Sequence, residues 1–70
     1  MRFVLSKHAK KRMIERKINI EDITSTVELP DYVINRGDKT EAYKKLKDKK
    51  LKVIYIKEDS FIKIITLIWT

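Results

Sequence analysis

Apolar side chains switch from a helical to an extended spacing along this chain, and the first helical stretch runs from Lys7 to Lys17. Ser6 precedes it as a natural N-cap, because its hydroxyl accepts a hydrogen bond from a free amide of the first turn. A rotation of about 100° per residue turns Ala9 and Met13 to one side, which we expect to be buried. Arg2 to Leu5 has the composition of a short strand. The first two elements are therefore a strand and a helix.

A second helix is predicted from Ile20 to Leu29. Asn19 is its N-cap, and two acids lie in its first turn, where the helix dipole favours them. Ile18 is placed to pack against Ile23 across the start of this helix. Pro30 ends the helix, because the residue before a proline avoids the α region. The apolar stripe of the helix consists of Ile20, Ile23 and Val27.

The remaining residues change to an extended pattern and predict four strands separated by short polar turns. The strands are expected at Asp31–Arg36, Thr40–Lys47, Leu51–Ile56 and Phe61–Trp69. The last two are the most apolar and should be central. Thr40–Lys47 is also rich in helix formers, but the short links on either side favour a strand with one wet face or a place near an edge. Short links between strands imply antiparallel hairpins.

These elements predict an α+β fold in the order β-α-α-β-β-β-β, with two helices packed on a twisted, four- to five-stranded antiparallel sheet. Residues 1–70 should form a single domain, because a chain of this length buries only ~60% of its unfolded surface. The absence of cysteine and the single histidine predict no metal and no cofactor. No apolar run has the length of a signal peptide or a membrane span, so we expect a cytoplasmic protein.

The formal charge of +7 is unevenly distributed along the chain. Residues 1–17 and 36–57 each carry a net charge of +6, residues 18–35 carry −4, and residues 58–70 carry −1. A fold that brings the two basic segments together has a positive face that attracts a polyanion. A lysine-rich composition without cysteine is also typical of selection for solubility or for a hot environment. Charge alone therefore does not establish a nucleic-acid partner.

The only histidine, His8, lies one helical turn before Arg12 and two before Arg16, so the three side chains share one stripe. Imidazoles titrate near neutral pH and guanidinium groups hold phosphate oxygens, a combination suited to RNA cleavage without a metal. In that reaction a base deprotonates a ribose 2′-OH, the oxygen attacks the neighbouring phosphorus, and an acid protonates the leaving 5′-oxygen. The catalytic candidates are His8, Arg12, Arg16 and Thr66, the last as a polar interruption of the final strand that binds substrate or positions His8.

Further side chains are candidates for contacting nucleic acid, namely Lys7, Lys11, Tyr43, Lys44 and Lys45. Every candidate has a structural alternative. His8 would be neutral and bonded to a backbone carbonyl of the sheet, Arg12 would pair with Glu15, and Arg16 would pair with an acid of the second helix. Thr66 would be an ordinary strand residue, and the lysines would form a solvated face.

Ser6 to Arg16 reads S-K-H-A-K-K-R-M-I-E-R and fits the pattern Ser/Thr-x-His-Ala-x-x-Arg-Met-x-x-Arg. An acidic helix ending in L-P-D and lysine-rich strands closing on I-T-L-I-W follow it. Over nearly its whole length the chain resembles a prokaryotic family known only as a domain of unknown function. That family is similar to the RelE-like and BrnT-like toxins and, through them, to metal-independent endoribonucleases such as barnase and the tRNA-cleaving colicins. The resemblance implies a RelE-like fold, RNA as substrate and an antitoxin protein as partner.

Two classes of function follow from these observations. The first is a metal-independent endoribonuclease of toxin type, controlled by an antitoxin and acting on tRNA or ribosome-bound RNA. The alternative is a non-catalytic module that binds RNA or DNA, in which the same cations only neutralise phosphates and His8 is structural. A single histidine with no carboxylate placed near it predicts a slow enzyme. A third class, a scaffold protein, predicts that Arg12 and Arg16 make no contribution to nucleic-acid affinity.

Overall fold

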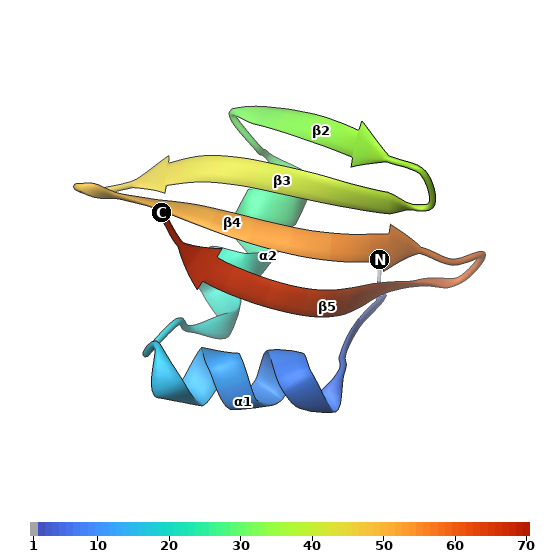
Figure 1. Cartoon of the computed structure of the whole chain (residues 1–70), viewed down its shortest axis with the longest axis horizontal. Helices are drawn as coiled ribbons and strands as arrows, with labels where there is room; N and C mark the ends of the chain where they lie inside the picture. The colour runs from blue at the N-terminus through green and yellow to red at the C-terminus, as the bar shows by residue number, and fades with distance from the viewer. Residues whose placement is uncertain (1) are drawn as a thin grey trace.

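The computed structural model describes residues 2–70 and consists of one five-stranded sheet with two helices packed against it (Figure 1). In chain order the elements are β1 (Arg2–Leu5), α1 (Lys7–Glu15), α2 (Ile20–Glu28), β2 (Tyr32–Arg36), β3 (Lys39–Leu46), β4 (Lys49–Lys57) and β5 (Phe61–Trp69). The predicted α+β class and element order are confirmed, and β3 is a strand rather than a helix. In the part of the chain so described, neither helix is long and apolar enough to cross a membrane.

The sheet is mixed, with the strand order β1-β5-β4-β3-β2. Strands β2 to β5 are antiparallel neighbours, as their short turns predict. β1 lies at one edge and runs parallel to β5, with Leu5 opposite Ile64. The prediction of an antiparallel sheet is therefore wrong at this edge. The reason is that both helices lie between β1 and the other strands in the chain, and the hairpin rule does not apply to such a connection.

Helix α1 ends at Glu15, two residues before the predicted end at Lys17. The amides of Lys17 and Ile18 donate to the carbonyls of Ile14 (3.3 Å) and Met13 (3.0 Å), an arrangement called a Schellman motif. Lys17 takes the left-handed conformation that this motif requires, with a φ of 52°. Glycine usually marks this position, so a lysine there hides the end of the helix from sequence inspection.

Both predicted N-caps are confirmed. The hydroxyl of Ser6 accepts from the amide of Ala9 (3.0 Å), and the side chain of Asn19 accepts from the amide of Asp22 (2.9 Å). The turn between β2 and β3 has two residues, and its first, Gly37, has a φ of 66°. A glycine tolerates this conformation without the steric cost that a Cβ atom brings. Local sequence signals therefore account for both helix starts and for this turn.

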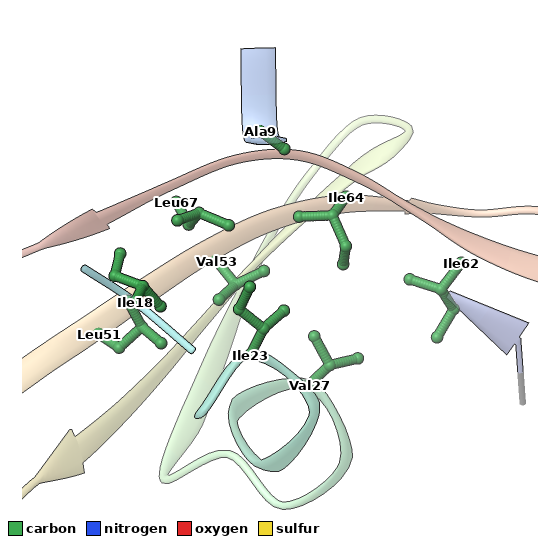
Figure 2. Close-up of a cluster of buried hydrophobic side chains, with 9 residues drawn as sticks. All are labelled: Ala9, Ile18, Ile23, Val27, Leu51, Val53, Ile62, Ile64 and Leu67. Atoms are coloured by element: carbon green, nitrogen blue, oxygen red, sulfur yellow. The ribbon is translucent and has the colours of Figure 1, made fainter. Parts of the chain in front are cut away.

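The core lies between the helices and one face of the sheet (Figure 2). Ile18 and Ile23 meet in this core, as their spacing predicts. Ile20 is exposed, so its assignment to the buried stripe of α2 is wrong. Thr26 is buried instead, because its hydroxyl donates to the carbonyl of Asp22 (2.7 Å) and needs no water. The complete buried cluster is Ala9, Ile18, Ile23, Val27, Leu51, Val53, Ile62, Ile64 and Leu67.

Candidate nucleic-acid interface

The first residues of the His-containing motif attach α1 to the edge of β5. A bulge in β5 makes Ile65 an extra residue between the paired positions Ile64 and Thr66. The hydroxyl of Ser6 donates to the carbonyl of Ile65 (2.9 Å), and its amide donates to the carbonyl of Ile64 (3.0 Å). Ala9 follows one turn later and is completely buried in the core cluster. Ser6 and Ala9 therefore have structural roles.

Arg16 attaches the other end of α1 to the same strand. Its Nη1 donates to the carbonyl of Leu67 (2.7 Å), and Nε1 of Trp69 donates back to the carbonyl of Arg16 (3.0 Å). The predicted pairing of Arg16 with Glu21 or Asp22 is wrong, because the side chain extends to β5 rather than to α2. The guanidinium is half-buried and anchored to the backbone, which leaves it less free to hold a phosphate.

His8 and Arg12 form an accessible pair on α1. Arg12 Nε donates to Nε2 of His8 (3.4 Å), and Arg12 Nη1 contacts Oε1 of Glu15 (2.7 Å). The pairing of Arg12 with Glu15 is confirmed, and the hydrogen bond from Arg12 lowers the pKa of that carboxyl. Within residues 2–70 no backbone carbonyl accepts from His8, so the predicted bond to the sheet is wrong for this exposed side chain. His8 and Arg12 are the two catalytic candidates that the fold brings together.

Thr66 does not join His8 and Arg12. It alternates with Leu67, which is buried under the helices, so Thr66 belongs to the opposite face of the sheet. α1 instead lies along the edge of β5 (Figure 1). No hydrogen bond between Thr66 and His8 occurs in the described part of the chain. The prediction that Thr66 positions His8 is therefore not supported by the geometry.

The face of the sheet without helices, called the open face below, is strongly basic. Strand alternation and register place seven cationic side chains on it, which are Arg2, Arg36, Lys39, Lys45, Lys50, Lys52 and Lys63. Glu41 is the one carboxylate that the same alternation places there in the five described strands. Most of the formal net charge of +7 therefore lies on one side of the molecule.

Two stacked tyrosines lie within this basic surface. The rings of Tyr32 and Tyr43 face each other across β2 and β3, with centroids 4.7 Å apart and planes inclined by 12°. Nζ of Lys50 lies 5.3 Å from the ring centroid of Tyr32, and Nζ of Lys52 lies 5.7 Å from that of Tyr43. Ammonium groups at these distances are attracted by the negative ring faces. The aromatic pair is therefore surrounded by positive charge, and Tyr32 is exposed.

Glu41 organises the cations and the tyrosines of the open face. It is only 7% exposed, and its carboxylate contacts Arg36 Nε (3.0 Å), Lys52 Nζ (3.9 Å) and the hydroxyl of Tyr43, which donates to it at 3.1 Å. Burial acts to raise the pKa of Glu41, but the hydrogen bonds from Arg36 and Tyr43 outweigh it and leave the pKa below its usual value. One anion thus fixes three donors in place.

The predicted lysine contacts divide between the two faces. Lys44 lies on the helix-covered face, where its Nζ donates to the carbonyl of Leu29 at the end of α2 (2.6 Å). Its prediction as a nucleic-acid contact conflicts with this role, because a cation at a helix C-terminus interacts with the helix dipole. Lys45 is exposed on the open face, and its contact with a phosphate stays a prediction. Lys7 and Lys11 are exposed on α1.

A cavity of about 410 Å³ opens on the helix-covered side, between the start of α2 and the turn from β3 to β4. Its lining has charges of both signs, including Asp22 and Lys49, and Lys49 Nζ lies 5.5 Å from the ring of Trp69. Residues 2–70 contain no cluster of three or more histidine, cysteine or carboxylate side chains that would hold a metal ion. The mixed charge makes this cavity a poorer anion site than the open face.

Sequence reasoning missed most of the open face. It did not identify Arg36, Glu41 or the tyrosine partner of Tyr43, which is Tyr32, and it treated Lys50 and Lys52 only as part of a basic segment. The period of two in β3 was a usable signal. Every second residue of this strand is charged or aromatic, namely Lys39, Glu41, Tyr43 and Lys45, and the buried Ala42 lies between them. The missing information was the strand order, which brings β2 beside β3.

The fold and the open face together define a small α+β domain with one basic, aromatic-containing sheet surface. The chain belongs to a family described as a domain of unknown function, DUF4258, whose model matches residues 5–69. Comparisons with curated proteins and with solved structures give no match.

Proposed function

We propose that this chain binds single-stranded RNA on the open face of its sheet. The observation that carries the proposal is the concentration there of seven cationic side chains against a single carboxylate, Glu41. Cations that neutralise phosphates release counterions and supply most of the affinity for a polyanion. The stacked pair of Tyr32 and Tyr43 adds an aromatic surface on which an unpaired base stacks. Binding to cellular RNA would place the chain in the cytoplasm.

The proposal is tested with a labelled single-stranded RNA by fluorescence anisotropy over a series of salt concentrations. In one variant, Lys45→Gln and Lys63→Gln remove two exposed charges from the open face. A matched control, Lys10→Gln with Lys57→Gln, removes two exposed charges outside it. The open-face variant should bind more weakly, and its plot of log K against log salt should be less steep by roughly 0.7 per lost phosphate contact.

The control variant separates a local site from a general effect of charge. Equal loss of affinity in both variants would contradict the proposal, because it would mean that only the total charge matters. A DNA of the same sequence is measured in parallel. Equal affinity for RNA and DNA would retain the open face as the binding surface and remove the specificity for RNA.

Metal-independent RNA cleavage is the second candidate function, and the contact between the exposed His8 and the half-buried Arg12 favours it. Nε2 of His8 lies 3.4 Å from Nε of Arg12, which donates to it, and this nitrogen would be the base of the proposed step. It would take the proton of a 2′-OH while that oxygen attacks phosphorus and the bond from phosphorus to the 5′-oxygen breaks. The resulting imidazolium would protonate the 5′-oxygen, and Arg12 would stabilise the charged phosphorane.

The resemblance of the sequence to a family that is similar to RelE-like and BrnT-like toxins would imply the same activity and an antitoxin as partner. It is tested by incubating RNA with the protein in EDTA, beside His8→Ala, Arg12→Ala and the control Lys10→Gln. A nuclease would leave 2′,3′-cyclic phosphate ends, and each of the first two variants would lower the rate by about 10²–10⁴ without lowering affinity to the same extent. Binding without cleavage by every protein would leave RNA binding alone as the function.

A further inference from the structure

Exposed apolar side chains gather at the β2 edge of the sheet. Leu29, Tyr32 and Val33 are 72%, 45% and 44% exposed, and they lie within five residues of one another. Only three other large apolar side chains of residues 2–70 are exposed, and these are distributed over α1, α2 and β5. Tyr32 lies on the open face and Val33 on the helix-covered face, so exposed apolar side chains flank the β2 edge on both faces. An exposed edge strand with apolar side chains is a typical site for pairing with another strand.

β2 is an edge strand whose second side has no neighbouring strand in the sheet (Figure 1). The two-residue turn that follows β2 makes Arg36 and Lys39 a hydrogen-bonded pair. Hydrogen-bonded and non-hydrogen-bonded pairs alternate along an antiparallel ladder, so the backbone amides and carbonyls of Val33 and Asn35 point away from β3. The strand contains no lysine and no proline, the residues that commonly protect an edge from further pairing. Its outer side is therefore available to another strand.

The segment of the chain that leads into β2 is acidic, whereas β2 itself contains one charged residue, Arg36. Residues 18–35 carry a net charge of −4, in contrast to +7 for the whole chain. Most of these acids lie in α2, on the helix-covered side, where they offset part of the repulsion between two basic molecules. Asp31 directly precedes β2 and Arg36 ends it, so opposite charges lie near each other when two copies run in opposite directions. Each charge would then add a second contact to its present one, which is with the Lys45 amide for Asp31 and with Glu41 for Arg36.

We propose that β2 pairs with β2 of a second copy of this chain, antiparallel about a two-fold axis at Ile34. In this register Val33 lies opposite Asn35 of the second copy, so the outward amides and carbonyls of both strands satisfy one another in four hydrogen bonds. Ile34 lies opposite Ile34 of the second copy on the open face, and Tyr32 lies opposite the other copy's Arg36. A two-fold interface of this kind closes at the dimer.

The pairing would make one continuous sheet of the two copies. An axis perpendicular to the sheet keeps both open faces on the same side and both sets of helices on the other. The dimer would therefore present one basic surface about twice as long as that of a single copy. The proposal does not rest on RNA binding, because it is argued from the exposure and the hydrogen-bonding groups of β2 and from the charges at its two ends.

A single cysteine tests the register directly, because the natural chain has none. Ile34 and its counterpart form a non-hydrogen-bonded pair with Cα atoms about 4.5 Å apart, within reach of a disulfide. Ile34→Cys should therefore give a covalent dimer on mild oxidation. Asn35→Cys is the control, because a rise of about 3.4 Å per residue places the two copies of that position roughly 8 Å apart, beyond disulfide geometry.

The unmodified protein gives a second, independent measurement. Its mass by sedimentation equilibrium should rise with concentration from 8.4 kDa towards that of two chains. Val33→Lys with Asn35→Lys should keep it at the mass of one chain while its thermal unfolding is retained, because four lysines then face one another across the axis. A monomer at every concentration, or cross-linking through Cys at 35 as readily as at 34, would overturn the proposal. Capture of a strand from a different protein by a monomeric chain would also overturn it.

Discussion

The two faces of the sheet differ in what holds their side chains in place. On the helix-covered face, Leu51, Val53 and Ile64 have no exposed surface and pack in one apolar cluster. On the open face, cations and tyrosines are held by cross-strand contacts with Glu41 and its neighbours. Burial stabilises the first arrangement, whereas the second keeps like charges close together and accessible. Stability and the proposed RNA binding should therefore respond to different substitutions.

The largest effect on stability is expected from Ile64→Ala. Ile64 is completely buried, and its truncation removes transfer energy and leaves a cavity, which costs about 2–5 kcal/mol. Ile68→Ala is the matched control on the same strand, because Ile68 is 38% exposed and faces the other side. Urea unfolding followed by circular dichroism should give a clearly smaller loss for Ile68→Ala. Similar losses for the two variants would mean that the faces do not differ in their contribution to stability.

Glu41→Gln should have an intermediate effect on stability at neutral pH. The carboxylate is the shared acceptor for Arg36, Lys52 and Tyr43, and a neutral amide replaces its charge while it retains the shape of the side chain. The free energy of unfolding at pH 7 should fall, by less than for Ile64→Ala. Without the carboxylate, the side chains of Arg36, Lys52 and Tyr43 should be less ordered. RNA affinity is therefore expected to change, even though the natural Glu41 repels phosphates.

The pH dependence of stability tests whether the charge of the Glu41 carboxylate causes the loss of stability in Glu41→Gln. Burial raises the pKa of Glu41, but the bonds from Arg36 and Tyr43 leave it below the usual value. Such a group stabilises the fold above the ordinary glutamate pKa, and the contribution is lost as the pH falls through the lowered pKa. The stability difference between the natural chain and Glu41→Gln should therefore shrink from about pH 7 to about pH 3. A difference that is constant over this range would show that the carboxylate charge is not involved.

Much of the fold was predictable because its signals are local. Ser6 and Asn19 each lie three residues before the amide that they cap, and the apolar run from Phe61 to Trp69 gives the bounds of β5 directly. The prediction failed where a local sign was absent or where distant segments meet. Lys17 occupies a left-handed position without being glycine, and β1 pairs with β5 from the other end of the chain. Neither feature follows from the spacing of neighbouring residues.

The candidate site was predictable only in part, for the same reason. The spacing of His8 and Arg12 fixes their contact, because residues four apart on a helix are neighbours. The same spacing placed Arg16 with them, whereas its guanidinium bonds to the carbonyl of Leu67, 51 residues later in the chain. Thr66 was predicted to lie with His8, and Lys44 with the nucleic-acid contacts, but Thr66 lies on the open face and Lys44 on the helix-covered face. The sequence does not reveal which face of the sheet the helices cover.

The smallest effect on stability is expected from Lys63→Gln on the open face, next to Ile64 in the chain but on the opposite side of the sheet. Surface substitutions usually change stability by less than about 0.5 kcal/mol. Removing one of seven clustered cations relieves repulsion, so the melting temperature should be unchanged or slightly raised at low salt, and the gain should vanish when salt screens the charges. RNA affinity should fall in the same variant. Lys10→Gln on α1 is the control, and it should leave both properties nearly unchanged. A loss of stability in Lys63→Gln at low salt would contradict the view that the open face retains its cations for binding at the expense of stability.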